Sequence, residues 1–125
     1  MANLKARDLE VYKKAFASAV EIHRVSENWP KHELYGGLAE QMRRASRSIC
    51  ANLVEGLAKM GSAEQRRFLN IALGSAEEVQ VWSEFAVALG YARQDWGKKM
   101  ENGYSEIGKM LFGLMQRRDG KGRKA

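Results

Sequence analysis

Apolar residues recur every three or four positions along four long segments of this chain, and this spacing constrains the fold more than any other feature. The segments run roughly over residues 8–27, 34–60, 62–89 and 95–118. The single proline, Pro30, lies in the first break, so the strongest helix breaker is absent from every segment. Because the breaks are only a few residues long, successive helices are expected to be antiparallel neighbours. The sequence therefore predicts an all-α, up-down-up-down antiparallel four-helix bundle.

The inner faces and ends of these helices are also predicted. The apolar stripe of the first segment consists of Leu9, Tyr12, Phe16, Ala19, Val20 and His23. The stripe of the second segment includes Leu38, Met42, Ile49, Leu53 and Met60. The stripe of the fourth segment includes Met100, Tyr104, Ile107 and Leu111. The expected helix-end residues are Gly61 and Gly90 as C-terminal caps, Ser62 with Gln65 as a capping box, and Asp95 as an N-cap.

Length and composition favour a single domain. A chain of 125 residues can close one hydrophobic core, and 45% hydrophobic with 29% charged residues is an ordinary globular balance. We expect the bundle to occupy residues 1–118 and a flexible basic tail to follow over residues 119–125. No apolar run approaches the ~20 residues needed to cross a bilayer, the first residues are charged, and Cys50 is the only cysteine. These features predict a cytoplasmic location.

The third segment carries more apolar surface than one bundle can cover. At ~100° per residue, Leu73, Val81 and Phe85 fall outside its inner stripe, and Phe112 points away from the stripe of the fourth segment. Scattered apolar residues are normal on protein surfaces. Several on one helix of so small a bundle instead indicate a subunit interface. We therefore predict a homo-oligomer whose interface includes Leu73, Val81, Phe85 and Phe112.

Four glycines, Gly97, Gly103, Gly108 and Gly113, lie within the fourth segment. Each costs about 1 kcal/mol relative to alanine in a helix interior. We expect the close approach of another backbone, from the same chain or another, to offset that cost.

A ridge of polar residues follows one edge of the second segment's apolar stripe. Its members are Gln41, Arg44, Ser48, Asn52 and Glu55, and Glu78 lies at the equivalent edge of the third segment. An arginine with two carboxylates at a core boundary favours a structural, hydrogen-bonded and charge-paired network. A catalytic acid/base pair of Glu55 and Glu78 is the alternative, but no nucleophile accompanies it. His23 and His32 lack cysteine or carboxylate neighbours at ligand spacing, so we expect no metal, no cofactor and no enzymatic activity.

The chain is basic, because 21 Lys and Arg against 15 Asp and Glu give a net charge of +6. Such a charge favours a polyanionic partner, since phosphate contacts release counterions. Neither a helix-turn-helix nor a sheet with aromatic platforms is predicted, so nucleic acid would be bound without strong sequence specificity. The predicted nucleic-acid-binding residues are Arg43, Arg47, Lys98, Lys109, Arg117, Arg118, Lys121, Arg123 and Lys124.

Two motifs make the chain similar to a known family. Residues 41–56, QMRRASRSICANLVEG, and residues 68–79, FLNIALGSAEEV, resemble the two signatures of four-helix bundle proteins encoded in intervening sequences of bacterial 23S ribosomal RNA genes, also called S23 ribosomal protein-like. The family includes the accessory variability determinant of diversity-generating retroelements, a basic pentameric bundle that binds a reverse transcriptase and nucleic acid. The resemblance implies a homopentamer. It also marks Arg44, Ser48, Asn52, Glu55 and Glu78 as family positions, without making them catalytic.

The sequence leaves more than one function open. The leading hypothesis is a non-enzymatic, basic, oligomeric accessory protein that binds RNA or DNA through phosphate contacts. The alternatives are a partner of a retroelement reverse transcriptase and a protein-assembly adaptor that binds no nucleic acid. An enzyme is the least favoured class, because no recognisable catalytic arrangement is present.

Overall fold

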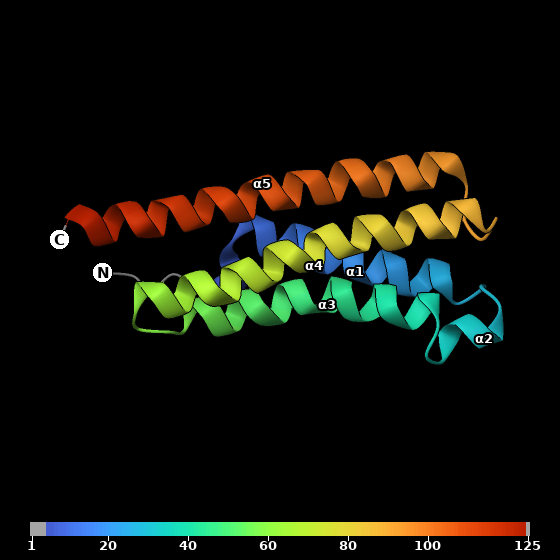
Figure 1. The fold of residues 1–125 in the computed structure, drawn as a ribbon, viewed down its shortest axis with the longest axis horizontal. Helices are drawn as coiled ribbons and strands as arrows, with labels where there is room; N and C mark the ends of the chain where they lie inside the picture. The colour runs from blue at the N-terminus through green and yellow to red at the C-terminus, as the bar shows by residue number, and fades with distance from the viewer. Residues whose placement is uncertain (1–4, 125) are drawn as a thin grey trace.

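The computed structural model describes the backbone of residues 5–124 and the side chains of residues 5–117. Within this part of the chain a 3-10 turn, η1 (Ala6–Asp8), precedes five helices, and no strand is present (Figure 1). The helices are α1 (Glu10–Ser26), α2 (Lys31–Leu34), α3 (Leu38–Leu57), α4 (Ser62–Ala88) and α5 (Gln94–Lys124). The predicted tail, residues 119–125, lies outside the described side chains, and the helical backbone of α5 reaches into it. None of the described helices is long and apolar enough to cross a membrane.

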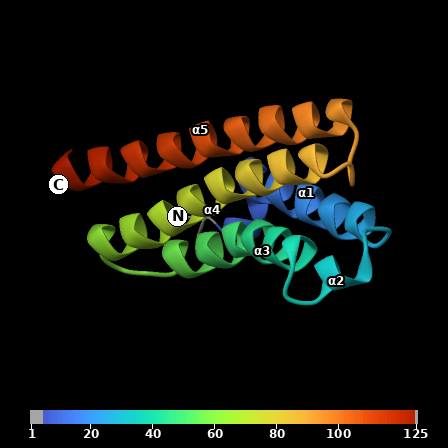
Figure 2. The ribbon, with the colours of Figure 1, turned by 45° about the vertical axis from the view of Figure 1, so that its right-hand side comes forward.

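The four long helices run alternately up and down the bundle. Both views show α1 and α4 pointing one way and α3 and α5 pointing the other (Figure 1; Figure 2). α1 packs against α3 and α5, and α4 packs against the same two helices. α1 and α4 therefore lie diagonally across the bundle from each other, as do α3 and α5. The predicted all-α, antiparallel four-helix bundle is confirmed, and the short α2 is an addition at one end.

One continuous core fills the space between these helices. Its largest fully buried side chains on α3 and α5 are Met42, Ile49 and Leu53, and Tyr104, Ile107 and Leu111. These residues confirm the stripes predicted for the second and fourth segments. Met60, predicted as the last stripe member of the second segment, is fully exposed, because α3 ends before it.

α1 faces the core with a different stripe from the predicted one. Val11, Ala15 and Ile22 are buried, whereas Phe16 is 52% exposed and His23 is also exposed. The predicted stripe is therefore wrong at Phe16 and His23, whereas its members Leu9 and Tyr12 are half-buried and pack against the core. The helix carries two neighbouring apolar stripes, and the one with the larger side chains lies on the outside.

The second predicted helix is broken at Gly36. This glycine has φ of +79°, in the left-handed region that favours glycine, and it separates α2 from α3. Glu33 caps α3, because its Oε1 accepts a hydrogen bond from the backbone N–H of Leu38 (2.8 Å) and its Oε2 accepts one from the Tyr91 hydroxyl (2.9 Å). These hydrogen bonds favour the carboxylate and lower the pKa of Glu33. The prediction of one uninterrupted helix over residues 34–60 is wrong.

The turn between α3 and α4 differs from the predicted capping. Gly61 follows α3 by several residues and is the N-cap of α4, not a C-terminal cap. Ser62 is already the first residue of α4, and no side chain caps this helix. The Gln65 amide instead donates to the Lys59 carbonyl (2.7 Å) and ties the turn to the helix. The predicted capping box is therefore wrong.

The turn between α4 and α5 follows the prediction at Gly90. Its φ is +80°, and the backbone N–H groups of Gly90 and Tyr91 donate to the carbonyls of Val87 (3.0 Å) and Ala86 (2.9 Å). This is the Schellman pattern that satisfies the last carbonyls of a helix. Asp95, predicted as the N-cap of the next helix, lies just inside α5.

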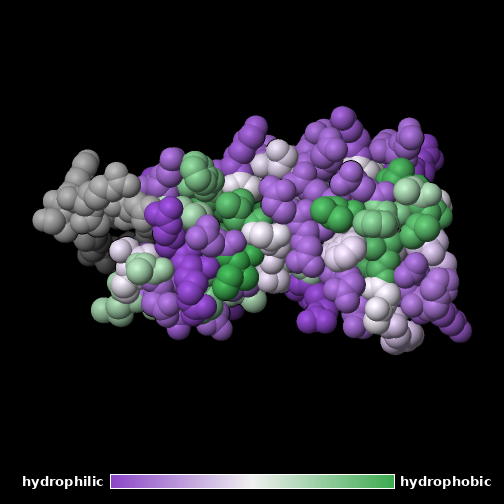
Figure 3. Space-filling view, viewed as in Figure 1, coloured by the Kyte–Doolittle hydropathy of each residue, from purple (hydrophilic) through white to green (hydrophobic). Residues whose placement is uncertain are grey.

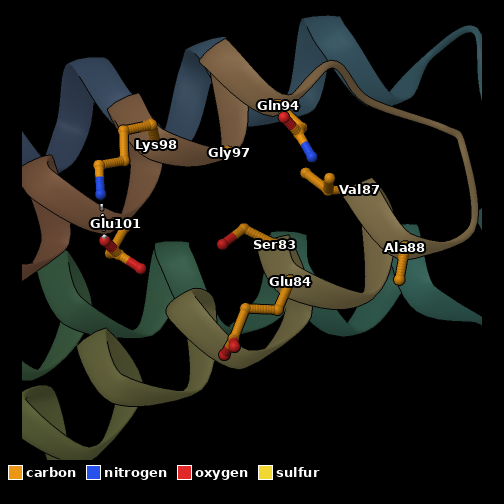
Figure 4. Close-up of a pocket in the computed structure, with 8 residues that line it drawn as sticks. All are labelled: Ser83, Glu84, Val87, Ala88, Gln94, Gly97, Lys98 and Glu101. Carbon is orange, nitrogen blue, oxygen red and sulfur yellow. Dashed lines mark hydrogen bonds and ion pairs between the residues drawn. The ribbon is translucent and has the colours of Figure 1, made fainter.

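Among Gly97, Gly103, Gly108 and Gly113 of α5, Gly97 is the one that another helix approaches most closely. A Cβ at this position would lie 2.6 Å from Cγ2 of Val87 on α4, and the two residues face each other in Figure 4. A Cβ at Gly108 would make an ordinary contact, and one at Gly103 or Gly113 would meet nothing within 4 Å. Close approach of a helix of the same chain therefore accounts for Gly97 and does not account for Gly103 or Gly113.

Candidate functional site

The polar ridge predicted along α3 borders a small groove between α3 and α4. The groove has a volume of about 210 Å³ and is lined by Gln41, Arg44, Ala45, Ser48, Ser75 and Glu78. Ser75 Oγ donates to Ser48 Oγ (3.0 Å), and the Asn52 amide donates to Ser48 Oγ (2.9 Å) and to its carbonyl (2.8 Å). The Glu78 carboxylate accepts a hydrogen bond from Trp82 Nε1 (3.3 Å). A chain of hydroxyl and amide groups thus links α3 to α4.

The charged members of the ridge do not pair with each other. Arg44 lines the groove, but it forms no ion pair or hydrogen bond within the part of the chain that the structure describes. Glu55 is exposed and lies three turns further along α3, outside the groove. The structure therefore contains the predicted network only in part, without its charge pairing. Ser75 on α4, which was not among the predicted ridge residues, makes the contact to Ser48 instead of a carboxylate.

Glu55 and Glu78 are too far apart to act as an acid/base pair. Glu78 lies across the groove from Ala45, and ten residues separate Ala45 from Glu55 along α3. At 1.5 Å per residue this is a separation of about 15 Å along the bundle. This separation argues against the catalytic alternative considered for these two carboxylates.

Four of the predicted nucleic-acid-binding residues lie along two diagonal helices: Arg43 and Arg47 on α3, and Lys98 and Lys109 on α5. Arg43 is turned toward α1, where it donates to Ser26 Oγ (2.8 Å) and to the His23 carbonyl (3.0 Å). Lys98 lies 3.5 Å from a carboxylate oxygen of Glu101 (Figure 4). These residues do not form one surface, because they point away from opposite sides of the bundle.

Several basic residues lie instead at one end of the bundle. Figure 1 shows that α1 and α4 begin toward this end and that α3 and α5 end there. We term this group the basic end, and its members are Lys5, Arg7, Lys59, Arg66, Arg67 and Arg117. The acidic residues at the same end are Asp8, Glu10, Glu55 and Glu64. Lys5, Arg7 and Arg117 form no ion pair among the described residues, and all three are exposed to solvent.

The basic end joins residues that lie far apart in the sequence. Of its members, Arg117 alone belongs to the predicted nucleic-acid-binding residues, and Lys5, Arg7 and Lys59 were missed. Only the alternating direction of the helices could have placed them together. Four further predicted residues follow Arg117, and their side chains lie outside the described residues: Arg118, Lys121, Arg123 and Lys124.

The predicted interface residues are exposed on the single chain, with one exception. Val81, Phe85 and Phe112 are 44%, 51% and 52% exposed. Leu73 is half-buried and packs against the core, because α5 covers this side of α4. Its expected exposure is therefore wrong. Phe16 on α1 is exposed to the same degree as Phe112, and the sequence had assigned it to the core.

The titratable side chains show no assembled reactive centre in the described part of the chain. No three His, Cys, Asp or Glu side chains gather there in a way that could hold a metal ion. Cys50 is half-buried, and burial raises the pKa of its thiol to about 11. The thiol is therefore protonated at neutral pH and is a weak nucleophile.

Taken together, the helices and the charged surfaces define a small, basic, antiparallel four-helix bundle. Residues 7–113 match the family of the 23S rRNA-intervening sequence protein, and the chain belongs to this family. A crystal structure of a protein of unknown function from the S23 ribosomal protein family of Bacteroides thetaiotaomicron is similar, with a TM-score of 0.77 and 26% identity over 85% of this chain and 95% of that one. No curated protein matches the chain. The family resemblance of the two sequence motifs is thereby confirmed.

Proposed function

We propose that this protein is a non-enzymatic, nucleic-acid-associated accessory protein of the cytoplasm, which binds phosphates through its basic end. The observation that carries the proposal is the position of Lys5, Arg7 and Arg117 at one end of the bundle, without ion partners among the described residues. α5 then leads further basic residues of the sequence away from the same end. The family supports the proposal, because it is named after an intervening sequence of 23S rRNA.

The chemistry of the basic end favours phosphates over bases. Its aromatic ring, Phe68, is covered by two cations, with Lys59 Nζ 5.2 Å and Arg67 Cζ 4.7 Å from the ring centroid. The ring is therefore not free to stack on a base. Lys and Arg side chains at helix ends reach phosphate oxygens readily, and such contacts carry no sequence information. Binding is then dominated by counterion release.

We also propose that the protein acts as a homo-oligomer and, from the family resemblance, as a pentamer. Val81 and Phe85 stay about half exposed on one helix of the single chain. Association of copies would bury these side chains and bring several basic ends together. A larger cluster of positive charge attracts polyphosphates more strongly and over a longer range.

Binding measured over a range of salt concentrations tests the phosphate contacts. Fluorescence anisotropy with duplex DNA and RNA of several sequences should show affinities that fall steeply with salt and depend little on sequence. Each phosphate contact on duplex DNA contributes about 0.9 to the slope of log affinity against log salt. The double variant Lys5→Gln, Arg7→Gln should therefore lower the slope by about 1.8 for each subunit that touches the duplex.

A matched control is available at the opposite end of the bundle. Lys31 and Arg93 are both exposed, and the variant Lys31→Gln, Arg93→Gln removes the same charge there, including the exposed ion pair of Arg93 with Asp95 (3.4 Å). We expect this control to change the slope little. Equal changes in the two double variants would contradict a basic end that contacts phosphates. Absence of binding at low salt would also contradict it, and binding to a reverse transcriptase alone would then favour the adaptor function.

A further inference from the structure

The outer stripe of α1 lines an apolar groove against α3. The groove has a volume of about 390 Å³ and is lined by Tyr12, Phe16, Ala19, Val20, His23, Arg24, Arg47 and Cys50. We term it the α1–α3 groove. The rings of Tyr12 and Phe16 stack with centroids 6.0 Å apart, and the Phe16 ring is half exposed. A groove of this size between two helices suits an apolar helix face.

The charges of the α1–α3 groove specify its occupant further. Arg24 and Arg47 both line it, and neither guanidinium group forms an ion pair or a hydrogen bond within the described part of the chain. No acidic residue lines the groove. Its occupant should therefore combine apolar side chains with carboxylates, which arginine binds through charge-assisted hydrogen bonds.

The outer surface of α4 has this composition. We term it the α4 face, and its exposed members are Glu77, Glu78, Val81, Glu84, Phe85 and Leu89. The stretch over residues 68–92 contains these three glutamates and no Lys, Arg or His, although the whole chain has a net charge of +6. Figure 3 shows hydrophobic side chains gathered over the C-terminal half of α4. The α4 face is thus acidic and apolar where the α1–α3 groove is basic and apolar.

The two surfaces cannot meet within one chain, because α1 and α4 are diagonal helices and their outer sides face away from each other. A two-fold dimer brings identical patches together and would set like charges against each other. A head-to-tail contact instead joins unlike patches and repeats from copy to copy.

We propose that the α4 face of one copy docks into the α1–α3 groove of the next, and that this repeated contact closes a ring. The inference rests on the homo-oligomer proposed above and specifies its interface. Side-by-side bundles related by rotation all point in one direction, so every basic end lies on the same rim of the ring. Arg47, predicted to contact nucleic acid, contacts a neighbouring copy instead. Phe112 lies on α5, outside both surfaces.

Substitutions at three equally exposed phenylalanines test the contact. Phe16→Asp places a carboxylate where it would meet the glutamates of the α4 face, and Phe85→Lys places a cation where it would meet Arg24 and Arg47. Phe112→Asp and Phe112→Lys are matched controls, because Phe112 is as exposed as the other two. By sedimentation velocity and native mass spectrometry, the wild type and both Phe112 variants should be oligomers. Phe16→Asp and Phe85→Lys should be monomers of 14.1 kDa with unchanged helix content.

Mixing the two defective variants distinguishes a head-to-tail contact from a two-fold one. Phe16→Asp keeps an intact α4 face and Phe85→Lys keeps an intact groove, so one good contact can form per pair. The mixture should give a heterodimer of twice the subunit mass and no larger species. A two-fold interface would give no such heterodimer.

The remaining outcomes separate this inference from the proposed function. A monomeric wild type would overturn both the ring and the proposed oligomer. Oligomers that persist in Phe16→Asp or Phe85→Lys, loss of assembly in the Phe112 controls, or a mixture without heterodimers would overturn the head-to-tail contact alone. Phosphate binding by the basic end is measured separately, with the Lys5→Gln, Arg7→Gln variant and its control. The result of that measurement does not depend on whether the head-to-tail contact exists.

Discussion

Replacing Gly97 with alanine should destabilise the bundle, even though alanine is the better helix former. α5 passes so close to α4 here that the new Cβ would lie 2.6 Å from Cγ2 of Val87. This is about 1 Å inside an ordinary contact between carbon atoms. Val87 and Gly97 are both half-buried at the edge of a groove between α4 and α5, but the β-branched Val87 side chain has few alternative rotamers, so relieving the overlap costs about 2 kcal/mol, within the range of about 1–3 kcal/mol for overpacking. The gain in helix propensity is about 1 kcal/mol at most. We expect the free energy of unfolding to fall by about 1 kcal/mol, which lowers Tm by about 4 °C for a chain of this size.

The same substitution at Gly103 is the control, because a Cβ there would meet nothing within 4 Å. Gly103→Ala should raise the free energy of unfolding by up to about 1 kcal/mol. Urea unfolding followed by circular dichroism, at one protein concentration, measures both variants. Adding Val87→Ala to Gly97→Ala should restore part of the loss, which appears as a coupling energy in the double-mutant cycle. Equal stabilities of the two glycine variants, or no coupling with Val87, would refute the argument from close approach.

Two further predictions concern titratable groups. Hydrogen bonds from Leu38 and Tyr91 lower the pKa of Glu33 below its usual value of 4.5, so this carboxylate stabilises the fold above that pH and the contribution is lost as the pH falls through the folded-state pKa. Thermal unfolding across the acid range should therefore show a smaller acid-induced loss of stability in Glu33→Gln, and identical curves would contradict a capping role for Glu33. Burial raises the pKa of Cys50 from 9.0 to about 11, which leaves about 100-fold less thiolate at neutral pH. Iodoacetamide should accordingly react about 100-fold more slowly with the native protein than with the urea-unfolded chain, and rates within roughly tenfold would contradict this.

The sequence predicts most accurately the helices that have a single apolar face, because that face can only be the one that packs against the core. The stripes of α3 and α5 are confirmed because each of these helices presents one apolar face, and that face meets the core. Gly90 is confirmed as a cap, because the apolar spacing of α4 stops just before it and its φ of +80° is in the left-handed region that favours glycine. Gly36 also has a left-handed φ, but its neighbours continue an apolar spacing that conceals the break between α2 and α3.

The candidate site was harder to predict, because its parts meet only in three dimensions. Lys5, Lys59 and Arg117 carry no shared motif, and the direction of four helices is what brings them to one end. Which α4 side chains face Arg44 across the groove depends on the register of α3 against α4. Sequence spacing along one helix places residues on a face, but it does not fix that register.

The error at α1 is itself informative about function. Periodic apolar spacing indicates which side chains are buried in the native protein. It does not show whether the same chain or another chain buries them. Phe16 and Phe85 are about half exposed in the single chain, and complete burial of a phenylalanine contributes about 1.5–3 kcal/mol. Roughly 1 kcal/mol per ring is therefore still available to association. A head-to-tail contact covers both rings in every subunit, because each copy offers its α4 face and receives that of its neighbour. The same contact aligns the basic ends on one side of the ring. The assembly interface therefore also determines the density of positive charge that the protein presents to a phosphate backbone.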